Sequence, residues 1–181
     1  FFVNNSLDPT TTSYGTPLPL NMEGTMNNIN GSRKSFSKTT TVHASPEQIF
    51  PLLCPVLEYE WIQGWKCELI YTVSGVIEKD CIFITNFDGI GKETWYVSEF
   101  TPNEHICFIR VSNNLSIRLE IDLIRKIDNT IDMRWSQIIT SISGSGVELL
   151  NNITQESFSA SVVERGQQLN HFIKTGSMMK R

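Results

Sequence analysis

The stretch that decides the fold is residues 143–176, "SGSGVELLNNITQESFSASVVERGQQLNHFIKTG". Ser145 and Glu148 have the spacing of a capping box, and they predict one helix that runs to Lys174, just before Gly176. At 1.5 Å per residue this helix would be about 40 Å long, which is enough to lie across a whole sheet. Its apolar residues recur at steps near 3.6 and form one stripe, composed of Leu150, Ile153, Phe158, Val162, Leu169, Phe172 and Ile173.

Upstream of this segment, residues 66–143 alternate between strand-like runs and turn residues. Six runs of six to ten residues are separated by short Gly-, Pro-, Asn- and Asp-containing connections, which predicts an antiparallel meander. The run 115–123 is the clearest, since apolar residues alternate there with Ser116, Arg118, Glu120 and Asp122. One face of that strand should therefore be core and the other should meet water.

Two further features precede the meander. Residues 34–43 alternate and carry β-formers, so we expect a strand there. In "SPEQIFPLL", Ser45 is a candidate N-cap and Pro46 a candidate first helical residue. Because Pro51 and Pro55 interrupt this region, two short helices should cover residues 46–62.

These elements predict an α+β fold. A curved antiparallel seven-stranded sheet would wrap around a long C-terminal helix, with two short helices after the first strand. We assign residues 32–181 to this domain and residues 1–31, rich in Asn, Thr, Pro and Gly, to an extended N-terminal arm. A sheet that curves around a single helix leaves a space beside it, so we expect a chamber lined by both.

Composition excludes several classes of function. The formal net charge of -4 gives no basic field for nucleic acid, and no apolar run is long enough to cross a bilayer. The four cysteines have no CxxC spacing and are interpreted as free thiols, which favours a cytoplasmic location. The chain begins at Phe1 rather than Met, so an upstream piece is allowed, and the sequence leaves the oligomeric state open.

In the order of its motifs, the chain resembles the START/Bet v 1-like superfamily, also called SRPBCC, over about residues 34–176. The resemblance rests on "SPEQIFPLL", "PVLEYEWIQGW", "ELIYTVSG", "WYVSEFTP", "MRWSQIITSISGSG" and "FIKTG", in that order. It implies a helix-grip fold with a ligand chamber between the sheet and the C-terminal helix. Members of the superfamily carry lipids, sterols or plant metabolites, and others act as polyketide cyclases or dehydratases, so the resemblance implies no single chemistry.

The candidate chamber residues begin at the junction of the short helices and the meander. Trp61 would end the second short helix at the mouth of the chamber and Trp65 would begin the next strand, with Gly64 permitting the turn between them. Both tryptophans could instead plug the junction between helices and sheet. Glu58 is a solvated helix residue unless it faces inward, where it would be a candidate acid or base.

The remaining candidates are aromatic or apolar positions on inward-facing strand faces and on the helical stripe. Plain core packing is the alternative for each of them. Tyr96 and Arg110 are assigned outward, although a register slip of one residue would turn them inward. The candidates are Phe83, Trp95, Phe108, Trp135, Phe158 and Val162.

No reactive constellation is evident. His43, His105 and His171 are far apart and lack acids or cysteines at ligand or catalytic spacing, so we predict no metal site, no cofactor and no catalytic residue. The "SGSG" before the long helix lacks the Lys-Ser/Thr of a phosphate-binding loop.

Three functions follow, of which we favour the first. It is binding or carriage of an apolar small molecule or lipid in the chamber. The second is a cyclase, dehydratase or hydrolase in which Glu58, Tyr96 or Arg110 supplies polar chemistry. The third is a protein-interaction module in which the chamber is a filled core.

Overall fold

A single antiparallel sheet forms the body of the domain in the computed structural model, which describes residues 31–87, 91–128 and 130–180. The strand order is β1-β7-β6-β5-β4-β3-β2, so β1 and β2 are the two edges. This confirms the predicted seven-stranded α+β arrangement, whereas the predicted arm falls, apart from Gly31, outside the described residues. The strands are β1 (Arg33–Val42), β2 (Cys67–Tyr71), β3 (Ile82–Phe87), β4 (Gly91–Thr101), β5 (His105–Val111), β6 (Leu115–Arg125) and β7 (Ile131–Ser141).

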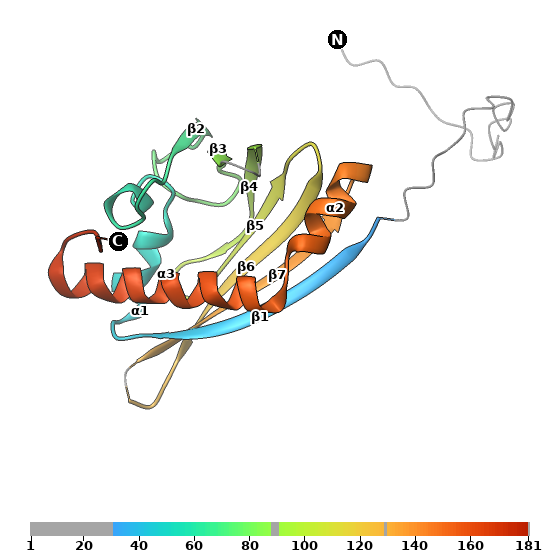
Figure 1. Ribbon diagram of the computed structural model, residues 1–181. Helices are drawn as coiled ribbons and strands as arrows, with labels where there is room; N and C mark the ends of the chain where they lie inside the picture. The colour runs from blue at the N-terminus through green and yellow to red at the C-terminus, as the bar shows by residue number, and fades with distance from the viewer. Residues whose placement is uncertain (1–30, 88–90, 129, 181) are drawn as a thin grey trace, which may run out of the picture.

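The helices occupy two regions of the chain. After β1 come α1 (Pro46–Ile49) and two 3-10 turns, η1 (Phe50–Leu53) and η2 (Glu58–Glu60). After β7 come α2 (Gly144–Asn152) and α3 (Gln155–Thr175), and α3 lies across the concave side of the curved sheet (Figure 1).

The prediction of one continuous C-terminal helix is wrong, because the chain leaves helical geometry at Ile153 and Thr154. Both residues are β-branched, which lowers helix propensity, and a threonine hydroxyl competes for backbone amides. Thr154 caps α3 in a capping box with Ser157. The cap of α2 is Ser143, whose hydroxyl accepts from the Gly146 amide at 2.9 Å, rather than the predicted Ser145.

Lys34, a residue of strand β1, stabilises the break between α2 and α3. Its Nζ donates to the carbonyl oxygens of Asn151 at 3.2 Å and Ile153 at 3.0 Å. Those carbonyls belong to the end of α2, where the helix leaves its own acceptors unsatisfied. A strand β1 side chain therefore fixes the end of α2.

The contact between α3 and β1 sets how closely the helix approaches the sheet. Gly166 faces Thr40, and a Cβ placed on Gly166 would lie 2.2 Å from Thr40 Oγ1 and 3.0 Å from Thr40 Cβ. Only a glycine permits this approach without displacement of the helix. As a result α3 rests against the β1 edge of the sheet, and the strands beyond β7 curve away from it (Figure 1).

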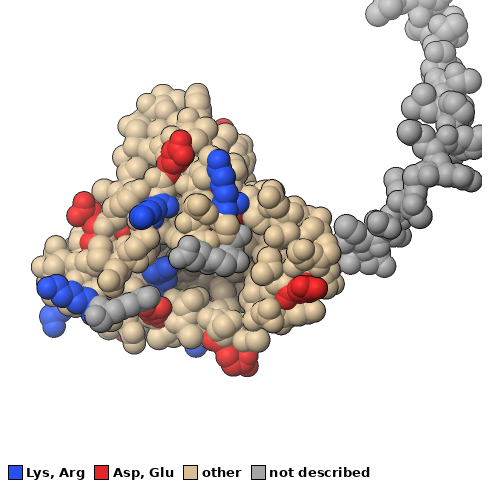
Figure 2. All heavy atoms as spheres, turned by 45° about the horizontal axis from the view of Figure 1, so that its top comes forward, with Lys and Arg blue, Asp and Glu red and all other residues tan. Residues whose placement is uncertain are grey.

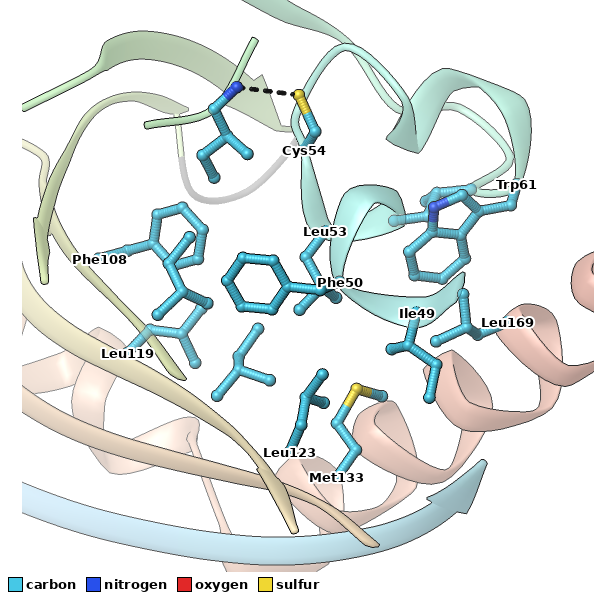
Figure 3. Close-up of a cluster of buried hydrophobic side chains, with 14 of the residues drawn as sticks. Ile49, Phe50, Leu53, Cys54, Trp61, Phe108, Leu119, Leu123, Met133 and Leu169 are labelled. Carbon is cyan, nitrogen blue, oxygen red and sulfur yellow. Dashed lines mark hydrogen bonds between the residues drawn. The ribbon is translucent and has the colours of Figure 1, made fainter. Parts of the chain in front are cut away.

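The main hydrophobic core lies beside α1 and η1, which contribute Ile49, Phe50 and Leu53 to it. Figure 3 shows Ile49, Trp61 and Leu169 side by side at the C-terminal half of α3, with Met133 and Leu123 below them. The alternation predicted for β6 is confirmed, since its inward residues Leu115, Ile117, Leu119, Ile121 and Leu123 are all buried.

The Gly166 contact can be tested by substitution. We expect Gly166→Ala to lower the free energy of unfolding by about 1–2 kcal/mol, because overpacking costs more than alanine gains in helix propensity. Adding Thr40→Ala removes the atoms nearest the new methyl group, and chemical denaturation should then show at least half of the loss recovered. Additive effects of the two substitutions, or a stabilised Gly166→Ala protein, would contradict this account.

Candidate functional site

A cavity of about 440 Å³ lies between the sheet, the short-helix segment and α3. Its walls come from strands β3 to β7, from the stretch between Leu53 and Trp65, and from one face of α3. The lining residues are Leu53, Pro55, Glu58, Ile62, Trp65, Phe83, Phe87, Trp95, Phe108, Arg110, Leu119, Ile121, Trp135, Gln137, Phe158, Ser161, Val162 and Arg165.

One wall of the cavity is a continuous aromatic cluster. Trp95 stacks on Phe83 with ring centroids 5.1 Å apart, and Phe108 meets Trp95 edge-on at 5.5 Å. Trp65 extends the cluster toward Phe87 at 5.5 Å. The indole nitrogens of this wall are satisfied, since Trp95 Nε1 donates to Thr85 Oγ1 at 2.8 Å and Trp65 Nε1 donates to Pro55 O at 2.8 Å. The wall therefore presents apolar ring faces.

A buried ion pair adjoins this wall. Arg110 Nη2 lies 2.5 Å from Glu93 Oε2, and the guanidinium carbon lies 4.1 Å from the Trp95 ring centroid. The Glu93 side chain is 0% exposed and that of Arg110 is 11% exposed. Two polar atoms of the pair, Glu93 Oε1 and Arg110 Nε, have no hydrogen-bond partner among the described residues.

The inward position of Arg110 overturns the prediction that it faces outward. Phe108 and Arg110 are two residues apart on β5, so they share a face of the sheet. The assignment of Phe108 to the inside already required Arg110 to be there. Tyr96 does face outward, next to the inward Trp95, and its hydroxyl donates to the Asp80 carboxylate.

Glu58 brings a carboxyl group to the same cavity from η2. Desolvation raises the pKa of this carboxyl to about 8, although the charges of Arg165 and Arg110 act in the opposite direction. At neutral pH the group is therefore mostly protonated and can donate a hydrogen bond. The Arg165 guanidinium in turn donates to Gln168 Oε1 at 2.8 Å.

All of the predicted chamber residues except Trp61 line the cavity. They are Glu58, Trp65, Phe83, Trp95, Phe108, Trp135, Phe158 and Val162.

Trp61 is placed elsewhere. It is 0% exposed, its Nε1 donates to Leu52 O at 2.9 Å, and it packs beside Ile49 and Leu169 (Figure 3). Gly64, at φ 78, makes the predicted turn that separates Trp61 from Trp65. The two tryptophans consequently point to different places, and only Trp65 reaches the cavity.

The sequence-based prediction did not include the polar residues Gln137, Ser161 and Arg165, which line the cavity. The periodicity of their strand or helix nevertheless places them on its inward face. Gln137 follows the inward Trp135 by two residues on β7. Glu93, which does not line the cavity but pairs with Arg110, precedes the inward Trp95 by two residues on β4. On α3, Ser161 and Arg165 follow Phe158 at the helical steps of three and seven.

Four further features of the described residues concern metal ligands, membrane spans, cysteines and surface charge. In the part of the chain that the structure describes, no group of three or more His, Cys, Asp and Glu side chains could hold a metal ion. No helix there is both long and apolar enough for a membrane span. The four cysteines are free thiols. Acidic and basic side chains are interspersed on the face shown in Figure 2, most of which is uncharged.

The pKa of Glu58 predicts a pH dependence of stability. In the unfolded chain this carboxyl titrates near 4.5, so between pH 4.5 and about 8 the folded protein holds a proton that the unfolded chain releases. The stabilisation from Glu58 is thus complete at low pH and is lost as pH rises toward 8. Relative to the wild type, Glu58→Gln should gain stability from pH 5 to 8 and then level off.

Denaturant titrations at several pH values measure this difference. The matched control is Glu60→Gln, an exposed position in the same turn, which should show no such trend. A ¹³C NMR titration of the Glu58 carboxyl with a midpoint near 4.5 would refute the assignment.

Comparison with known proteins finds similar folds among solved structures only. No protein-family model matches the chain, and no curated protein matches it. Among solved structures, norcoclaurine synthase from Thalictrum flavum is similar with a TM-score of 0.62 and 13% identity, covering 88% of this chain and 97% of that one. The Mll3558 protein from Rhizobium loti is similar with a TM-score of 0.58 and 11% identity, covering 78% of this chain and 97% of that one.

DynU16, from the dynemicin biosynthetic locus, is also similar, with a TM-score of 0.54 and 11% identity over 79% of this chain and 48% of DynU16. Sequence identities this low establish a shared fold and do not establish a shared function. The chain has the helix-grip fold of Bet v 1-like and polyketide cyclase-like proteins.

Proposed function

We propose that the chamber binds an apolar small molecule. The observation that carries the proposal is the cavity of about 440 Å³ whose main wall is formed by aromatic ring faces. Ligand pockets typically occupy roughly 300–1,000 Å³ and are lined by apolar and aromatic side chains with a few polar groups. The same volume argues against a filled core, which the interaction-module alternative requires.

The energy available is sufficient for binding. A ligand that buries on the order of 300 Å² of apolar surface gains about 7 kcal/mol at ~25 cal/mol per Å². Association entropy reduces this gain, so micromolar affinity is a reasonable expectation without strong polar contacts. The chamber therefore needs no reactive group in order to bind.

Neighbouring valines on α3 provide a matched test. Val162 is buried and lines the cavity, whereas Val163 is 39% exposed. We expect Val162→Phe to fill part of the cavity and weaken binding of 8-anilinonaphthalene-1-sulfonate (ANS) at least tenfold, while Val163→Phe leaves binding unchanged. Fluorescence titration measures both. Equal affinity in the two variants would exclude the chamber as the binding site.

A second candidate function is acid–base catalysis, which the position of Glu58 favours. A carboxyl whose pKa is raised to about 8 beside two arginines is poised to exchange a proton near neutral pH. Norcoclaurine synthase shows that a protein of this fold is an enzyme. Here Glu58 would act as the base once ionised, and Arg165, which also lines the cavity, would stabilise negative charge that develops on a substrate.

A generic proton-transfer probe tests this candidate. With 5-nitrobenzisoxazole, ionised Glu58 would take the C3 proton as the N–O bond breaks, which releases the coloured cyano-nitrophenolate. We expect the rate to rise with pH around a midpoint of about 8 and to fall at least tenfold in Glu58→Gln but not in Glu60→Gln. Equal rates in the two variants would remove Glu58 as the base.

A further inference from the structure

A second cavity adjoins the chamber. It has a volume of about 280 Å³ and lies toward α2, at the end of the sheet where α2 gives way to α3. Four residues line both cavities, namely Arg110, Gln137, Phe158 and Ser161. The two spaces are therefore neighbours across one shared wall.

The two cavities differ in the chemistry of their linings. The chamber is bounded by aromatic rings, whereas the second cavity is bounded mainly by aliphatic side chains. These come from β6, β7, α2 and the turn after α2. They are Leu115, Ile117, Ile139, Leu149 and Ile153.

Hydrogen-bond donors gather at the shared wall. Arg110 Nε is buried and has no hydrogen-bond partner among the described residues, and the half-buried Gln137 brings an amide group to both cavities. On the chamber side, Trp135 Nε1 is a third donor, and it too has no partner among the described residues. A ligand atom that accepts hydrogen bonds at this wall would satisfy groups that are otherwise costly to bury.

The charge at the wall indicates what kind of acceptor fits. Arg110 is already neutralised by Glu93 at 2.5 Å. The donors at the wall therefore do not require a charged partner, and a neutral carbonyl oxygen meets their needs at a lower desolvation cost than a carboxylate.

We propose that the two cavities form one bipartite site, whose ligand places an aromatic end in the chamber, a carbonyl group at the shared wall and an aliphatic arm in the second cavity. This inference rests on the proposed binding function. It names the ligand class as aryl ketones, esters or amides with an alkyl arm.

Alkyl phenyl ketones are the matched probes for this site. Butyrophenone and octanophenone differ only in the length of the alkyl arm, and butylbenzene and octylbenzene are the corresponding hydrocarbons without a carbonyl group. Displacement of ANS measures all four affinities. We expect octanophenone to bind wild type at least tenfold more tightly than butyrophenone, since each buried methylene contributes roughly fourfold. We also expect each ketone to bind about fivefold more tightly than its hydrocarbon.

Two variants assign these effects to the two parts of the site. Leu149 lines only the second cavity, so Leu149→Phe should remove the gain from the longer arm by weakening octanophenone binding far more than butyrophenone binding, because the butyrophenone arm is short. Ile124→Phe, on the exposed side of β6, is the control and should keep the gain. Gln137→Met should reduce the preference for ketone over hydrocarbon.

The outcomes separate the two proposals. If Leu149→Phe keeps the full gain from the longer arm, or if wild type shows no preference for the ketones, the bipartite site is wrong while binding in the chamber stands. If wild type binds neither ANS nor any of the four compounds, the proposed binding function fails and this inference fails with it.

Discussion

The approach of α3 to β1 at Gly166 and Thr40 is the constraint on which the rest of the structure depends. A helix packed centrally on a curved sheet would fill the concave side with its own side chains. Here the missing Cβ of Gly166 lets α3 settle on the β1 edge, where a methyl group would meet Thr40 Oγ1 at 2.2 Å. The helix is thereby held to one side, and strands β3 to β6 face open volume instead of a packed stripe. The chamber is a consequence of this one-sided packing.

The interior of the chamber combines apolar surface with a few buried ionisable groups. Removing an arginine and a glutamate from water is costly, and their mutual attraction compensates only where the geometry is good. Arg110 meets this condition by pairing with Glu93 and lying over the Trp95 ring. Glu58 avoids the cost differently, by remaining protonated. The cavity can thus contain polar groups without a large unbalanced charge.

The parts of this structure that follow from local periodicity could be predicted from the sequence. The seven strands, the inward face of β6 and most of the chamber residues depend on alternation and on turn chemistry, which are local.

The break between α2 and α3 could not be predicted from the apolar stripe, because the stripe continues through Ile153. It depends on the capping preference of Thr154 and on Lys34, which reaches the end of α2 from a strand more than a hundred residues earlier in the chain. The prediction that Trp61 lines the chamber fails for a similar reason, because periodicity does not give the backbone geometry of the turn at Gly64 that separates the two tryptophans. Arg110 is a different case, because its burial contradicts the usual preference of its residue type while obeying the alternation of its strand.

The distribution of the tryptophans gives the protein an optical property of its own. Trp65, Trp95 and Trp135 border the chamber, whereas Trp61 is enclosed in the core. Any occupant would alter the surroundings of three indoles at once, and the emission of the fourth would follow only the integrity of the fold. Intrinsic fluorescence, resolved by replacing these tryptophans one at a time, therefore distinguishes filling of the interior from loosening of the whole domain.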